Sequence, residues 1–164
     1  MNRFKPHIYI IPEDDCDRQL ANGFVDYGRV SSQVKVMPPA GGWSFVLKKF
    51  TQEYVDVLRK DKQGQEGYVI LLIDFDGKYD ARRKHFEESI PEDLKHRVFV
   101  VGAKETPEIL RQQLQLGKGF EPIGTQLAEE CFSQNFSMWD HDHLAHNAAE
   151  RARMVNTIRS ILFS

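Results

Sequence analysis

The chain has 164 residues, 41% of them hydrophobic, which is enough to bury one full core but hardly two. Its 22 Lys and Arg residues are balanced by 24 Asp and Glu, and the formal charge of −2 excludes binding of nucleic acid through a global basic field. No stretch approaches the ~20 apolar residues of a membrane span, and residues 1–6 lead into too short an apolar run for a signal peptide. The two cysteines, Cys16 and Cys131, lack metal-ligand spacing. We therefore expect one domain in the cytoplasm, where both thiols stay free.

The first half of the chain predicts three strands, each followed by a helix. The strands are expected at residues 7–11, 34–37 and 68–73, and the helices at 14–27, 43–59 and 81–88. Gly41 and Gly42 precede the second helix and permit positive φ and close approach to a ligand. Within that helix, apolar residues recur at helical spacing: Phe45, Val46, Phe50, Tyr54, Val57 and Leu58.

The second half continues the alternation of strands and helices. A strand is expected at residues 97–102, followed by a helix with Thr106 as its cap, Pro107 at its first position and Leu116 at its end. Two more helices are expected at 123–131 and 142–162. This order indicates an α/β fold with a Rossmann-like parallel sheet of about four strands and helices on both faces. We assign residues 1–120 to this α/β domain and 121–164 to a C-terminal helical extension packed on it.

Acidic residues follow two of the predicted strands. A cluster at residues 13–17 (Glu-Asp-Asp-Cys-Asp) follows the first strand, and Asp74 and Asp76 follow the third. The carboxyl ends of parallel strands meet at one edge of a sheet, where ligands bind. Carboxylates gathered there repel one another unless a cation neutralises them, and oxygen ligands suit Mg²⁺ or Mn²⁺. The sequence therefore predicts a divalent-metal site, although Asp14 and Asp15 fit equally well as helix caps.

This arrangement resembles the Toprim domain, the metal-binding module of topoisomerases, primases and the overcoming-lysogenization-defect type of nuclease, and it is closest in pattern to the last. The Toprim pattern has a glutamate ending the first strand, often another acid four residues on, and an Asp-x-Asp ending a later strand. Glu13 with Asp17, and Asp74 with Asp76, match this pattern. The resemblance covers roughly residues 7 to 116, and Asp14 departs from it because the family commonly has glycine there.

The resemblance implies a metal-dependent nuclease acting on DNA or RNA, with two ions held ~4 Å apart. Its implied principal ligands and catalytic residues are Glu13, Asp74 and Asp76, with Asp17 and Glu108 as auxiliary ligands. It also implies a separate ATPase subunit as partner and a role in phage defence, since the chain has no phosphate-binding loop of its own.

Basic residues follow the Asp-x-Asp element and are candidates for contacts with phosphates. Lys78 is the candidate for a catalytic contact. The set expected to bind nucleic acid is Lys78, Arg82, Arg83 and Lys84, which also fits a solvated helix face.

Other interpretations of the same residues stay open. A response-regulator receiver also gathers acids at strand ends, but it expects Ser or Thr where Gly102 and Ala103 stand. A haloacid-dehalogenase-type phosphatase has a similar Asp-x-Asp-Gly motif, but it usually has Thr where Lys78 stands. A third alternative is a non-catalytic regulatory or interaction module that docks through its C-terminal helix.

A group of histidines near the C-terminal helix has two interpretations. Two of them, three residues apart, have the spacing to bind a metal from a helix, but no cysteine or zinc-hydrolase motif accompanies them. We expect the group, His141, His143 and His146, to pack beside Trp139 instead.

Overall fold

The fold is built on one parallel sheet, which positions every element discussed below. The computed structural model describes residues 1–164 except 116 and 118. Its four strands lie in the order β2-β1-β3-β4, and all neighbouring pairs are parallel. The predicted α/β fold with a four-stranded parallel sheet is confirmed. The strands are β1 (His7–Pro12), β2 (Val34–Val36), β3 (Gly67–Leu72) and β4 (Val98–Val101).

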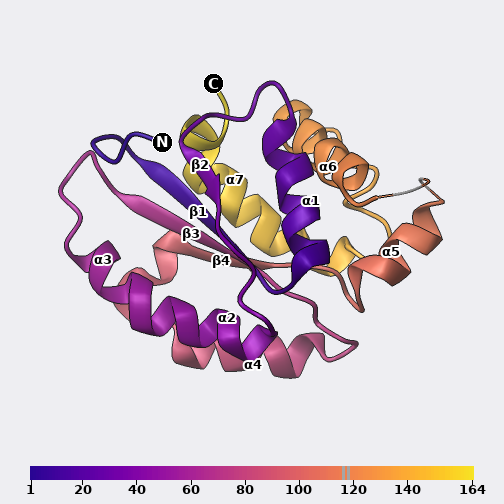
Figure 1. Cartoon of the computed structure of the whole chain (residues 1–164), viewed down its shortest axis with the longest axis horizontal. Coiled ribbons are helices and arrows are strands. Elements are labelled where there is room, and N and C mark those ends of the chain that lie inside the picture. Colours follow the sequence, from indigo (N-terminus) through magenta and orange to yellow (C-terminus); the bar gives the residue numbers. More distant parts are fainter. Residues whose placement is uncertain (116, 118) are drawn as a thin grey trace.

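Helices cover both faces of the sheet (Figure 1). One face carries α1 (Asp15–Asp26), α5 (Pro107–Leu114), α6 (Glu121–Ser133) and α7 (Ala148–Leu162), and the other carries α2 (Trp43–Lys49), α3 (Val55–Arg59) and α4 (Tyr79–Ser89). Successive β1 residues point to opposite sides, so Ile8 and Ile10 enter one apolar cluster and Tyr9 and Ile11 the other. No helix in the described part of the chain is long and apolar enough to cross a membrane.

The helix predicted over residues 43–59 contains a π-helical turn, η1 (Phe50–Tyr54), between α2 and α3. A π turn holds more residues than an α turn and shifts the residues after it around the helix axis. Val57 was expected on the apolar face but is 44% exposed, while Val55 is buried instead. Phe45, also expected inside, is 54% exposed because the buried face of α2 runs through Val46 and Leu47.

The C-terminal helix begins later than predicted. It starts at Ala148, after a 3-10 turn, η3 (Ala145–Asn147), and not at Asp142. The carbonyl groups just before it are used elsewhere, since His143 O accepts from the Lys104 N–H and Leu144 O accepts from the Asn147 side chain. The cap and first residue of α5 are Thr106 and Pro107, as predicted, but its expected end, Leu116, lies outside the described residues.

Helix α1 is held against α6 by two glycines that permit close backbone approach. A Cβ atom on Gly23 would lie 2.0 Å from the Glu121 carbonyl oxygen, and one on Gly124 would lie 1.9 Å from that of Leu20. Because these contacts leave no room for side chains, α6 fixes the position of α1 and of the acidic residue it carries into the site.

Side chains of η3 and α7 occupy the outer edge of β4, which is the last strand of the sheet and pairs with β3 alone among the described strands. These side chains lie three residues apart along the chain and contact alternate residues at the edge. Asn147 forms hydrogen bonds with both backbone groups of Gly102. Glu150 Oε2 accepts from Val100 N at 3.0 Å, and Arg153 donates to Val98 O at 2.5 Å. These contacts satisfy the edge groups that would otherwise be open to another strand. A further 3-10 turn, η2 (Glu92–Arg97), leads into β4.

We predict that Glu150→Ala lowers the free energy of unfolding by on the order of 2 kcal/mol, because it leaves the buried Val100 N–H without its acceptor and removes the carboxylate that pairs with Arg83 and Arg153. The matched control is Glu87→Ala, which removes an exposed carboxylate that lies 3.6 Å from Arg83 and should change stability by less than about 0.5 kcal/mol. Urea denaturation of both variants measures the difference, and equal effects would contradict the role given to Glu150.

Candidate metal centre

Three carboxylates from different elements meet at the carboxyl edge of the sheet. Glu13 follows β1, Asp74 follows β3, and Asp17 lies in the first turn of α1. One oxygen of each lies within 4.8 Å of the other two. The exposed fractions are 8% for Glu13, 1% for Asp17 and 5% for Asp74, so the group is buried. The acids that follow the two central strands therefore meet, as the sequence analysis predicts.

The main chain fixes Glu13 in place. Its N–H donates to Leu72 O at 2.9 Å, and its carbonyl accepts from Gly41 N at 2.8 Å. The loop at Gly41 and Gly42 has φ of 99° and 153°, so the positive φ expected of these glycines is confirmed. The side chain is held as well, because Oε2 accepts from the Asp74 N–H at 2.6 Å. Glu13 thus joins β1 to the end of β3.

The acids beside Asp17 have roles in starting α1. Asp14 is the N-cap, and its Oδ1 accepts from the Asp17 N–H at 2.9 Å. Asp15 is exposed and pairs with Arg18 at 2.6 Å. This capping geometry turns the Asp17 side chain inward, towards Glu13 and Asp74.

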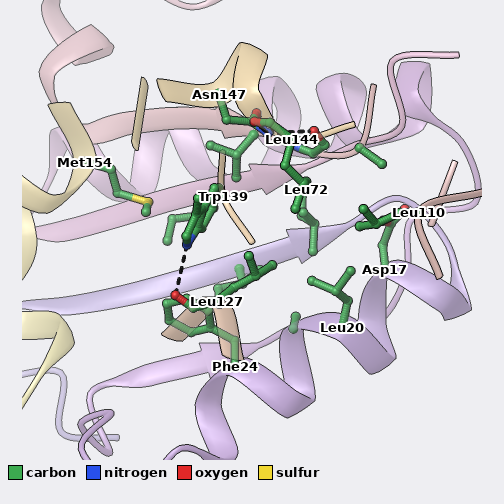
Figure 2. A pocket seen from close by; sticks show the side chains of 16 residues that line it. Asp17, Leu20, Phe24, Leu72, Leu110, Leu127, Trp139, Leu144, Asn147 and Met154 are labelled. Atoms are coloured by element: carbon green, nitrogen blue, oxygen red, sulfur yellow. Dashed lines mark hydrogen bonds between the residues drawn. The ribbon is translucent and has the colours of Figure 1, made fainter. Parts of the chain in front are cut away.

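Asp17 also borders an apolar cavity of about 60 Å³ between the sheet and α1 (Figure 2). Of the lining residues that the structure describes, Asp17 is the only ionisable one. Apolar residues of several elements surround the remainder, among them Leu20, Leu72, Leu110, Leu127 and Trp139. One side of the Asp17 carboxyl group therefore faces apolar side chains, which cannot solvate its charge.

Burial and mutual repulsion shift the titration of the three acids. Burial raises the pKa of Asp17 well above its usual value, and the negative charge of Asp74 adds to this effect. Burial likewise raises the pKa of Asp74 to about 8. Burial also raises the pKa of Glu13, although the hydrogen bond from the Asp74 N–H acts to lower it. Two buried oxygens, Asp17 Oδ2 and Asp74 Oδ1, have no hydrogen-bond partner in the described part of the chain. These atoms need a proton or a metal ion.

Two predicted ligands do not belong to this group. Asp76 is the next acid along the chain, but its Oδ2 accepts from Arg82 at 2.6 Å and its side chain is 45% exposed. Glu108 accepts from the Cys16 thiol at 3.1 Å. The structure thus places Asp17 in the centre and Asp76 at the periphery, the reverse of their predicted order.

The four basic residues predicted to bind nucleic acid divide into two pairs. Lys78 and Lys84 are exposed and remain available to a phosphate. Arg82 is 8% exposed, with its guanidinium 4.5 Å from the centre of the Trp43 ring, and Arg83 donates to Glu150 at 2.7 Å. Both arginines make internal contacts that the sequence analysis missed. One feature of the sequence does indicate that Arg82 is buried: it lies four residues before Phe86, and this spacing places both residues on the buried side of α4.

Among the described residues, the acidic group is the only cluster of three potential metal ligands, so the histidines do not form a second one. The rings of His141 and His143 stack 5.5 Å apart. His146 Nε2 lies 2.7 Å from Gly102 O, and its ring packs edge-on against Phe75. The ring partners of His146 are thus Phe75 and Tyr79, not the Trp139 that the sequence analysis expected.

Comparison of the chain with protein-family models, with curated proteins and with solved structures finds no match. The assignment of a function therefore depends on the geometry of the acidic group and on the sequence pattern.

We predict that the metal-free protein becomes less stable as the pH rises from about 5 to 8. The pKa of Asp74 is raised from 3.8 to about 8 on folding. Its contribution to the stability of the folded protein is therefore complete below the unfolded pKa and is lost as the pH rises through the folded pKa. Asp74→Asn removes this titration and should flatten the dependence. Thermal melting in the presence of a chelator measures this pH dependence, since each kcal/mol of stability shifts the melting temperature by roughly 2–4 °C.

The matched control for this prediction is Asp15→Asn, which changes an exposed acid on the same helix as Asp17. It should retain the dependence of the wild type. Parallel melting curves for the wild type and Asp74→Asn would contradict the assignment.

Proposed function

We propose that the protein is a divalent-metal-dependent nuclease that cleaves phosphodiester bonds in DNA or RNA, with Mg²⁺ or Mn²⁺ held by Glu13, Asp17 and Asp74. The observation that carries the proposal is the convergence of three buried carboxylates at the carboxyl edge of a parallel sheet. The resemblance of the sequence to the Toprim pattern directs the proposal to nucleic acid. By the same resemblance, a separate ATPase subunit is the proposed partner and phage defence the proposed setting.

The chemistry of the three side chains fits such an ion. All three supply hard oxygen ligands, and the unpartnered oxygens of Asp17 and Asp74 are buried beside Glu13. Burial is the largest cause of the raised pKa of Asp17 and Asp74, and repulsion by neighbouring carboxylates is a further cause. A cation at this position would remove that repulsion. The group therefore supplies both the ligand atoms and the electrostatic reason to bind a metal.

When bound, the ion would polarise the phosphate and lower the pKa of a coordinated water. The chain contributes the positioning. The Asp74 N–H holds Glu13 in one orientation, and Asp14 fixes the helical turn that presents Asp17. Lys78 is exposed two residues after Asp76 and supplies a cation for a phosphate at this edge. We place the protein in the cytoplasm, where the free thiols of Cys16 and Cys131 remain reduced.

The burial of the acids favours one rival function, a regulatory or interaction module that binds an ion only for stability. Exposed fractions between 1% and 8% leave little surface of the ligands open to a substrate. A module of this kind binds the metal and gains stability from it, as any ligand of the native state does. The two functions differ in cleavage, not in metal binding.

We predict that Mn²⁺ supports nicking of plasmid DNA or cleavage of RNA, and that Asp74→Asn and Glu13→Gln each reduce the rate by at least about 100-fold, because loss of a direct ligand costs more than loss of a supporting contact. The control variant is Asp15→Asn, whose exposed carboxylate pairs with Arg18 and should be dispensable. Metal binding by the wild type without cleavage of either nucleic acid would favour the rival module.

A further inference from the structure

Arg82 lies beside the acidic group of Glu13, Asp17 and Asp74, where a cation would otherwise be needed. Its Nη1 donates to Asp74 O at 2.8 Å and to Asp76 Oδ2 at 2.6 Å. The side chain is 8% exposed, which is unusual for arginine unless its charge is paired. It therefore bridges the main chain of one member of the acidic group to the nearest acid outside that group.

The surrounding structure holds the guanidinium in this position. The Trp43 ring covers it at 4.5 Å, and Trp43 itself follows the Gly41–Gly42 loop that bonds to Glu13. Asp76 has φ of 49°, a left-handed conformation that aspartate tolerates better than most residues. The stack on Trp43 and the hydrogen bond to Asp74 O thus hold the guanidinium where it pairs with Asp76.

A second metal ion would need carboxylates that are already engaged. In two-metal sites the ions lie about 4 Å apart and share ligands, so the second ion must draw on acids next to the first set. The adjacent acids are Asp14 and Asp76, whose charges both act on Glu13. Asp14 caps α1 through its Oδ1, and Asp76 is paired with Arg82.

We propose that the Arg82 guanidinium takes the place of a second cation, so that the acidic group binds one divalent ion per chain and not two. The inference rests on the metal site of the proposed function and changes its mechanism. One ion would have to serve both the attacking and the leaving oxygen, with Arg82 balancing the charge of Asp76. Arg82 is a positioning residue in this arrangement, because its burial keeps it from touching the substrate.

The test is the number of Mn²⁺ ions bound per chain, measured by calorimetric titration and by electron paramagnetic resonance, which distinguishes an isolated ion from a coupled pair. We expect one ion for the wild type, and one for Arg82→Lys, which keeps the charge. Arg82→Gln frees Asp76 and should bind a second ion at least tenfold more tightly than the wild type does. The double variant Arg82→Gln with Asp76→Asn should return to one ion.

Arg83→Gln is the matched control, since it removes the neighbouring arginine of α4, which pairs with Glu150 away from the acidic group, and this variant should bind one ion. Two ions on the wild type would overturn this inference while leaving the proposed function intact, and so would a folded Arg82→Gln variant that still binds one. If Arg82→Gln does not fold, the wild-type count still decides. A wild type that binds no ion would overturn both the inference and the proposed function.

Discussion

The repulsion among three buried carboxylates is the constraint on which the rest of the site depends. Glu13, Asp17 and Asp74 place an oxygen each within 4.8 Å of the others, and none is more than 8% exposed. Water cannot screen charges in such a position, so the group must take up a proton or a cation. The raised pKa values of all three acids express this requirement, with burial as the largest cause in each. A protein that gathers acids in this way without a ligand would lose stability, which is why metal binding is the simplest account.

The neighbouring structure keeps the acids together against their repulsion. The Asp74 N–H holds Glu13, Asp14 fixes the first turn of α1, and the glycine contacts between α1 and α6 prevent Asp17 from moving away. On the opposite face of the sheet, Trp43 and Arg82 fill the space beside Asp76. Each of these contacts uses main-chain groups or rigid packing. The geometry of the site is therefore set by the fold before any ion binds, which lowers the cost of binding.

The sequence predicted the sheet and the meeting of Glu13 with Asp74 because both depend on local pattern: buried apolar runs mark the strands, and parallel strands bring their ends to one edge. It ranked Asp17 below Asp76, since the inward direction of the Asp17 side chain depends on the geometry of the turn that Asp14 caps, which residue spacing alone does not specify. For Arg82, the spacing of four residues from Phe86 indicates a buried position, but its stacking partner Trp43 comes from a separate segment and could not be predicted. The predicted start of α7 was wrong because the His143 carbonyl accepts from the distant Lys104 N–H, while the Leu144 carbonyl accepts from Asn147 in a 3-10 turn and not from an α-helical donor.

The central claim is that the acidic group holds a proton until a metal ion replaces it. Proton release on Mn²⁺ binding tests this directly, by calorimetric titration near pH 7 in buffers of different ionisation enthalpy. Because the pKa of Asp74 is about 8 in the metal-free protein and that of Asp17 is also raised, the account predicts release of at least about one proton for each ion bound near pH 7, with the share from Asp74 falling above pH 9. Binding of Mn²⁺ with no proton release near pH 7 would contradict it.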